Sequence, residues 1–460
     1  MVRSEPPSPA ELLELAFAAH ARGDLAAAER GYRRLLSTAP DHPETLHLLG
    51  VLLHQGGRSD EALGLIGRAM ELQPERPDRY NDLGNILFQR GALEEATAAF
   101  LRAIELQRND AGFWNNLGAV LEARAQREEA DYAYRQAIAI DPHFVAALDN
   151  LGRLLSARGD SREAAEYLCR AYVEGPVEGK PKKMLGIAYY TLGMIDQATA
   201  VYRQWLAEEP GNPIARHLLA ACSGQDVPAR AADAYVEQSF DAFAERFDGQ
   251  LAGLSYHVPA LLAQTLADLL PPERRLAVLD AGCGTGLCGL ELAPYASRLT
   301  GVDLSSKMLA LAGDRDVYDE LVRAELSGYL AGHPGAFDLI VIADTLIYFG
   351  TLEPVFAAAH DSLRAAGLLL FTLEEPPAAA GEDGYGIKPN GRYGHGPAYL
   401  DAALKAHGFE ARSVSPVSIR VELGVAVNGY LVVAARPGEI SAAGSPARRS
   451  PVPDPRPGRR

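Results

Sequence analysis

The sequence contains few cysteines and carries an excess of negative charge. Its four cysteines, Cys169, Cys222, Cys283 and Cys288, form no Cys-x-x-Cys pair and show no metal-ligand spacing. This scarcity favours reduced thiols in a cytosolic protein and predicts no metal site. Acidic residues outnumber basic ones by 60 to 44, for a formal charge of −16. Because a nucleic-acid backbone is itself negative, we expect no nucleic-acid partner.

Long apolar runs are also missing. No stretch approaches the roughly 20 apolar residues that a membrane-spanning helix needs, and the first residues, MVRSEPPSP, lack the apolar core of a signal peptide. We therefore expect a cytoplasmic protein that makes no membrane contact. The chain is 460 residues long and 48% hydrophobic. That length is too great for one ordinary core, so at least two domains are expected.

The first half of the sequence repeats with a period of 34 residues. Each block has a small residue at its eighth place, an alanine at its twentieth and a large residue at its twenty-fourth. The eighth places hold Ala16, Gly50, Gly84, Gly118, Gly152 and Gly186, and the twentieth hold Ala28, Ala62, Ala96, Ala130, Ala164 and Ala198. Small residues at these places let two antiparallel helices approach closely. The pattern therefore predicts an all-α solenoid.

This array resembles the tetratricopeptide repeats. The resemblance implies an array over residues 9–225, in which a capping helix at 213–222 follows six units. The units span about 9–42, 43–76, 77–110, 111–144, 145–178 and 179–212. The first helices of such repeats line a concave surface, where the resemblance places Asn81, Asn85, Asn115, Asn116, Asp149 and Asn150.

An amide side chain both donates and accepts hydrogen bonds, so a ladder of asparagines can bind an extended peptide backbone. This arrangement is similar to the asparagine ladder of O-linked N-acetylglucosamine transferase. We therefore expect a protein or peptide partner in the groove. The alternative is an ordinary solvated face built from common repeat residues.

Residues 276–305 carry the most informative motif of the second half. An apolar run ends in Asp280, a glycine loop follows with Gly282, Gly284 and Gly286, and a second apolar run ends in Asp303. This order predicts a βαβ unit whose glycines let the backbone approach a ligand closely. The acid 23 residues after Asp280 stands where a ribose diol would be held.

The glycine loop resembles the first motif of the class I S-adenosylmethionine-dependent methyltransferases more closely than a nicotinamide site. Leu287 stands where the dinucleotide motif requires its third glycine. Another nucleotide-binding α/β domain remains the alternative. The resemblance implies a Rossmann-like α/β domain with a seven-stranded sheet over residues 271–436. The further strands are expected near 321–326, 337–344, 367–373, 409–421 and 425–435.

The resemblance also implies a set of residues for S-adenosylmethionine. Asp280 would anchor the methionine ammonium group, and the three loop glycines would give backbone contact with the methionine and ribose parts. Asp303 would accept hydrogen bonds from the ribose hydroxyls, and Leu304 would pack on the adenine. Glu325, expected to end the third strand, would lie by the adenine amino group. Asp344, after the fourth strand, would contact the methionine part or the incoming nucleophile.

Three residues are candidates for the chemistry itself. Asp344 and Tyr348 are expected at the carboxyl edge of the sheet, where open α/β folds bind ligands. His395 lies in the glycine-rich segment 391–397, which is expected to be a mobile substrate gate, and its imidazole could take a proton. No Pro-Pro-Tyr follows the fourth strand. This argues against an amide or DNA-amine acceptor and leaves oxygen, carboxyl, amine and carbon acceptors open.

Two further segments complete the domain plan. Residues 226–270 are expected to be helical, with aromatic residues at Tyr235, Phe240, Phe243 and Phe247. They form either an amphipathic connector or, by the resemblance, a lid over the cofactor. Residues 437–460 hold six prolines and no apolar periodicity, so they are predicted to be disordered.

The whole sequence resembles the bacterial methyltransferases that carry tetratricopeptide repeats. We therefore expect a methyltransferase whose repeats recruit a protein partner or a substrate. The alternative is a repeat scaffold with a cofactor-binding but inactive α/β domain. The resemblance does not settle the methyl acceptor.

Overall fold

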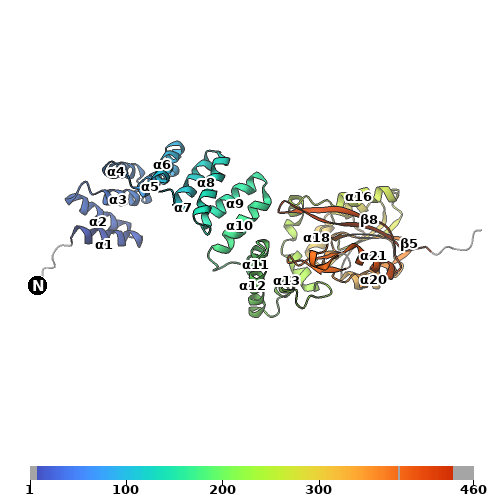
Figure 1. The fold of residues 1–460 in the computed structure, drawn as a ribbon. Helices are drawn as coiled ribbons and strands as arrows, with labels where there is room; N and C mark the ends of the chain where they lie inside the picture. Colours follow the sequence, from blue (N-terminus) through green and yellow to red (C-terminus); the bar gives the residue numbers. More distant parts are fainter. Residues whose placement is uncertain (1–7, 382–383, 439–460) are drawn as a thin grey trace, which may run out of the picture. The chain divides into compact units, whose positions relative to one another are not determined.

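The computed structural model describes residues 8–381 and 384–438 (Figure 1). The chain divides into two compact units. One consists of residues 1–181 with 191–193, and the other of residues 182–190 with 194–460. The segment 437–460, predicted to be disordered, lies outside the described residues from 439 onward. Within the described ranges, no helix combines the length and the apolar character that crossing a membrane requires.

Pairs of antiparallel helices build the first unit. They are α1 (Pro9–Ala21), α2 (Leu25–Thr38), α3 (Pro43–Gln55), α4 (Ser59–Leu72), α5 (Pro77–Gln89), α6 (Leu93–Leu106), α7 (Ala111–Ala123), α8 (Arg127–Ile140), α9 (Val145–Arg158) and α10 (Ser161–Glu174). The first helix of each pair begins where a sequence block begins. A Cβ atom on Gly84 would lie 2.6 Å from the Phe100 ring, and one on Gly118 would lie 2.5 Å from the Tyr134 ring. The small eighth residue is therefore required by the large residue at place 24.

The second unit begins with helices that the sequence assigns to the repeat array. These are α11 (Lys182–Thr191), α12 (Ile195–Glu208) and α13 (Pro213–Ser223). The expected connector follows as α14 (Asp233–Asp241), the short 3₁₀ helix η1 (Ala244–Arg246), α15 (Phe247–Gly253) and α16 (Val258–Leu269). Tyr202 on α12 is fully buried, and it packs with Ala198 and Leu218 in a small core of its own.

A seven-stranded sheet forms the centre of the second unit, with strand order β3-β2-β1-β4-β5-β9-β8. Its strands are β1 (Leu276–Ala281), β2 (Ala296–Asp303), β3 (Glu320–Arg323), β4 (Phe337–Ile342), β5 (Leu363–Glu374), β8 (Glu410–Glu422) and β9 (Val425–Ala435). The first five run parallel, and β9 pairs antiparallel with both β5 and β8. The expected fold class, a helical repeat solenoid followed by a seven-stranded α/β domain, is confirmed.

Helices cover both faces of this sheet. They are α17 (Gly289–Leu292), α18 (Ser306–Gly313), α19 (Leu326–Ala331), α20 (Glu353–Ser362) and α21 (Pro397–Ala406), with α16 from the connector. One buried cluster joins the sheet to α19, α20 and α21, and a second joins it to α16 and α17. Among the strands that both clusters use, the parallel strands β1, β4 and β5 are apolar on both sides, as expected for buried parallel strands.

Two local expectations differ from the structure. The segment around residues 391–397, expected to be a mobile loop, contributes to an antiparallel hairpin of β6 (Tyr385–Ile387) and β7 (Tyr393–His395). The third strand ends at Arg323, so Glu325 does not end it. Glu325 instead caps helix α19, where its carboxylate accepts hydrogen bonds from the Ser327 and Gly328 amides.

Candidate active site

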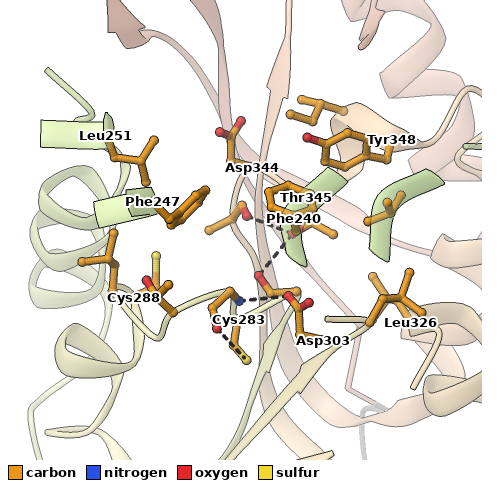
Figure 2. A pocket seen from close by; sticks show the side chains of 18 of the residues that line it. Phe240, Phe247, Leu251, Cys283, Cys288, Asp303, Leu326, Asp344, Thr345 and Tyr348 are labelled. Atoms are coloured by element: carbon orange, nitrogen blue, oxygen red, sulfur yellow. Dashed lines mark hydrogen bonds between the residues drawn. The ribbon is translucent and has the colours of Figure 1, made fainter. Parts of the chain in front are cut away.

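The carboxyl ends of β1, β2 and β4 open into a cavity of about 270 Å³. The strand order reverses between β1 and β4, and open α/β sheets bind ligands at such a point. In the view of Figure 2, Asp344 and Tyr348 lie at one end of the pocket and Asp303 and Cys283 at the other. Most of the predicted site residues line this cavity: Asp280, Gly282, Gly284, Asp303, Leu304, Glu325, Asp344 and Tyr348.

Asp280, the acidic residue near the end of β1, is fully buried and lines the pocket. Its Oδ2 accepts a hydrogen bond of 2.6 Å from the Tyr318 hydroxyl, whereas its Oδ1 has no hydrogen-bond partner. Burial raises the pKa of Asp280 to about 7, and the nearby charge of Asp303 acts in the same direction. A buried carboxylate oxygen without a partner is costly, so this atom is suited to receive a ligand cation.

The glycine loop requires its glycines for different reasons. Gly282 has a φ of 77°, and a Cβ atom there would lie 2.1 Å from Thr345 Oγ1. Gly284 has a φ of 53°, and the nearest atom to a Cβ there would be on Phe247, 3.9 Å away. Gly286 is not among the residues that line the cavity. A Cβ atom there would press on Arg315 and Tyr318, so this glycine serves the packing of the loop.

Asp303 fixes the loops on either side of it. One carboxylate oxygen accepts a hydrogen bond from the Gly284 amide at 3.0 Å, and the other accepts one from the Ser305 amide at 2.8 Å. Its neighbour Leu304 and the more distant Leu326 form an apolar part of the pocket wall. The end of β2 thus presents an acid beside an apolar surface, which suits a ribose next to an adenine.

The segment 233–253 makes polar contacts with the loops that follow β1 and β2. Asp241 accepts a hydrogen bond of 2.5 Å from Ser305, and Asp248 accepts one of 2.6 Å from Thr285. Between these contacts, the rings of Phe240, Phe243 and Phe247 cluster together and line the cavity. Figure 2 shows Phe240 and Phe247 pointing into the pocket.

Asp344 follows β4 with a φ of 50°, which is unusual for a residue with a side chain. Arg420 on β8 holds its carboxylate, with Nη1 at 3.2 and 3.0 Å from the two oxygens. Arg420 also contacts Glu374 at the end of β5 and lies 2.6 Å from Glu422. Arg420 is 2% exposed, so this ionic cluster is a buried wall of the pocket rather than a surface feature.

Arg392, next to β7, joins the same cluster. Its Nη2 lies 2.6 Å from Glu422, and its Nε lies 3.2 Å from Glu374. The two arginines hold the pKa of Glu422 at about 2, although burial acts in the opposite direction. Burial raises the pKa of Asp344 and of Tyr348. Neither arginine is predicted from the sequence: Arg420 lies in no local motif, and the glycine-rich segment 391–397 that contains Arg392 points to a loop and not to an ionic cluster.

His395 does not join the other candidates. It is fully buried in β7, outside the lining of the cavity, and its Nε2 lies 2.9 Å from the Gly350 carbonyl oxygen. Burial lowers its pKa to about 4. The structure thus places His395 in a hairpin strand rather than in the expected mobile loop, and outside the pocket. The short hairpin buries the ring beside Tyr385 and Tyr399.

The hairpin that carries Arg392 is held from outside the sheet. His217 on α13 lies with its Nε2 2.8 Å from the Gly391 carbonyl oxygen, and its ring stacks on Tyr235 at 3.9 Å. Gly391 has a φ of 87°, and a Cβ atom there would lie 2.9 Å from the Tyr235 hydroxyl. Helix α13, expected only to cap the repeats, therefore fixes the turn that precedes Arg392.

The asparagines of the expected partner groove bond to one another. Asn116 donates to Asn81 at 2.9 Å, and Asn150 donates to Asn115 at 3.0 Å. The same places in the preceding repeats hold His47 and Asp82, which lie 2.8 Å apart. These contacts form a ladder that joins the first helices of successive repeats. Asn85 is partly exposed on α5. The amides thus stabilise the array, whereas the peptide groove stays a prediction.

Comparison with known families assigns both halves of the chain. A methyltransferase domain model matches residues 278–367. Tetratricopeptide repeat models match residues 13–79 and 149–213, and a further repeat model matches residues 84–123. The chain carries tetratricopeptide repeats and a methyltransferase domain. The matched segment of this methyltransferase domain contains the glycine loop, Asp303 and Asp344.

Curated relatives are similar over the methyltransferase domain. A ubiquinone biosynthesis O-methyltransferase of Thiobacillus denitrificans is 34% identical over 23% of this chain and 47% of its own length. A magnesium-protoporphyrin O-methyltransferase of Rhodobacter capsulatus is 38% identical over 21% of this chain and 44% of its own. The chain thus spans less than half the length of these relatives.

Two solved structures are each similar to part of the chain. MamA is 27% identical, with a TM-score of 0.33, over 35% of this chain and 94% of its own. A SAM-dependent methyltransferase of Methanosarcina mazei is 18% identical, with a TM-score of 0.32, over 38% of this chain and 98% of its own.

Proposed function

We propose that the second unit binds S-adenosylmethionine and transfers its methyl group, and that the repeats recruit a protein partner or present the substrate. The observation that carries the enzymatic part is the free Oδ1 of Asp280 beside the glycine loop. Few buried carboxylate oxygens lack a partner, and a ligand ammonium group at this position would supply one.

The residues of the pocket fit the rest of the cofactor. The carboxylate of Asp303 could accept hydrogen bonds from the ribose hydroxyls. Leu304 and Leu326 offer apolar contact for an adenine ring. S-adenosylmethionine supplies a methyl group on a sulfonium sulfur, which is reactive in itself. The protein must therefore hold the methyl carbon in line with a nucleophile and exclude water. The three phenylalanines of segment 233–253 supply an apolar cover for this purpose.

The relatives support methyl transfer without specifying the acceptor. Two are named for ubiquinone biosynthesis and for magnesium-protoporphyrin, and another is an 18S rRNA guanine methyltransferase of Bos taurus. Repeats of this family commonly bind proteins through their concave surface. A pull-down with the full chain, followed by labelled methyl transfer to the retained proteins, tests the recruitment.

Calorimetric titration of the full chain with S-adenosylmethionine tests the enzymatic proposal. Asp303→Ala should weaken binding about 10- to 100-fold, because it removes charge-assisted hydrogen bonds worth roughly 1.5–3 kcal/mol. Asp361→Ala on α20 is the matched control, since its side chain is 76% exposed and does not line the pocket. Wild-type affinity in the folded Asp303 variant would show that this acid is misassigned. No binding by the wild-type protein at millimolar cofactor would contradict the enzymatic proposal.

A further inference from the structure

Three arginines line the pocket, and their hydrogen-bonding states differ. Arg420 is almost completely buried, and its three nitrogens all contact carboxylates. Arg230 is more exposed and bonds to Asp233 through Nη1. Arg392 is intermediate: its Nη2 bonds to Glu422, but its buried Nε makes no hydrogen bond.

Arg392 therefore has a buried donor without a hydrogen bond, whereas Arg230, which bonds through Nη1 alone, is more exposed to solvent. The Arg392 side chain is 19% exposed and lines the cavity, and its Nε contacts Glu374 only as an ion pair at 3.2 Å. Native proteins rarely leave a buried donor without an acceptor. A planar guanidinium group with free N–H bonds matches the two oxygens of a carboxylate.

The same wall offers poor candidates for a general base. The pocket lining contains neither a histidine nor a lysine among its described residues. Both carboxylate oxygens of Asp344 face Arg420, and Glu422 is held by two arginines. An alcohol or an ammonium acceptor must lose a proton before or during attack, whereas a carboxylate arrives without one.

The body of the acceptor meets an apolar surface. Phe240, Ile347, Tyr348 and Leu254 line the cavity, and the Phe240 and Tyr348 rings meet edge to face with centroids 5.6 Å apart. Aromatic side chains of this kind bury flat apolar groups well.

We propose that the methyl acceptor is a carboxylic acid with an apolar body, anchored by Arg392 and converted to its methyl ester. This inference rests on the proposed function and deepens it. A carboxylate oxygen forms a bond to the methyl carbon while the sulfur–carbon bond breaks, and the electron pair of that bond goes to sulfur. The carboxylate becomes a neutral ester and the sulfonium becomes a neutral thioether, so no proton is transferred. The ester no longer carries the charge that Arg392 holds, which favours its release.

Binding of matched probes tests the acceptor class without turnover. The full chain, saturated with S-adenosylhomocysteine, is titrated with trans-cinnamate and octanoate, and then with cinnamamide, cinnamyl alcohol and octanamide. We expect each acid to bind at least tenfold more tightly than its amide or alcohol, with an affinity that falls as salt rises. Equal affinity for the acids and their neutral partners, or tighter binding of the alcohol, would overturn the proposal.

Variants identify the anchor. Arg392→Gln should lower the affinity for cinnamate at least tenfold and leave that for S-adenosylhomocysteine within twofold. Arg298→Gln is the matched control, because this arginine pairs with Glu320 on the surface of the sheet. If Arg230→Gln weakened cinnamate binding and Arg392→Gln did not, the assignment of Arg392 would be wrong. If Arg392→Gln failed to fold, the comparison of acids with amides in the wild-type protein would still decide the acceptor class.

Turnover gives a second and chemically distinct readout. With methyl-labelled S-adenosylmethionine and the same acids, alkali should release the label as volatile methanol, because methyl esters hydrolyse in base and ethers do not. Label that stays fixed after alkali would contradict an ester product. Binding of S-adenosylhomocysteine without any preference for acids would refute this inference alone. Absence of cofactor binding would instead refute the proposed function.

Discussion

At the scale of single residues, we predict that the protonation state of Asp280 controls how the pocket binds a cation. Burial raises its pKa to about 7, so the carboxyl is mostly neutral at pH 6 and mostly ionised at pH 8. Only the ionised form attracts the ammonium group of the cofactor. The affinity for S-adenosylhomocysteine should therefore rise about tenfold from pH 6 to pH 8. Titration calorimetry at several pH values measures this change.

Variants of Asp280 and of its partner test the origin of that pH dependence. Asp280→Asn should bind weakly and with little change across this range. Tyr318→Phe should move the midpoint to higher pH, since the Tyr318 hydrogen bond stabilises the ionised carboxyl. A wild-type affinity that did not change between pH 6 and 8 would exclude Asp280 as the group that meets the ammonium.

The site residues that the sequence predicts correctly lie close together in the chain. Asp280, Gly282 and Asp303 fall within one βαβ motif, and their spacing alone places them at one edge of the sheet. Arg420 meets Asp344 from 76 residues away and Glu374 from 46 residues away. Such pairs depend on how β8 returns beside the parallel strands, which no local pattern specifies.

At the scale of elements, helix α13 is predicted to control the order of the β6–β7 hairpin. His217→Ala removes the hydrogen bond to the Gly391 carbonyl and the stacking on Tyr235. A lost hydrogen bond of this kind costs about 1 kcal/mol, so amides in the 388–392 turn should exchange about fivefold faster. Hydrogen exchange followed by mass spectrometry on the full chain measures the effect.

Two further variants separate positioning from general destabilisation. His217→Gln retains an N–H donor at nearly the same position and should restore part of the protection. His333→Ala, at the exposed end of α19, should leave the turn unchanged. If the amides of the 388–392 turn exchanged at the wild-type rate in the His217→Ala variant, other contacts would be sufficient to hold the hairpin. One such contact is the hydrogen bond from the Tyr393 hydroxyl to the Pro228 carbonyl.

The elements that the sequence predicts well are those with strong periodicity. The 34-residue period places the starts of α3, α5 and α7, and the apolar runs place β1 and β4. The hairpin escaped prediction because each of its strands spans three residues with a central glycine. So short a segment shows no alternation of apolar and polar residues, and glycine is typical of loops.

At the scale of the whole molecule, the two compact units predict two unfolding events. The first unit contains its own buried helical core, and the second contains the sheet and the pocket. A ligand stabilises the unit that binds it, so excess S-adenosylhomocysteine should raise the melting temperature of one transition only. Calorimetric scans of the full chain with and without this ligand provide the test.

A core variant in each unit assigns the two transitions. Leu151→Ala truncates a fully buried side chain of the repeats and should lower only the ligand-independent transition, at a cost of about 2–5 kcal/mol. Leu369→Ala, equally buried in β5, should lower only the transition that the ligand raises. A single transition that both variants lower, and that the ligand raises as a whole, would show that the units unfold together. Cofactor binding would then stabilise the repeats as well, and occupancy of the pocket would bear directly on partner capture.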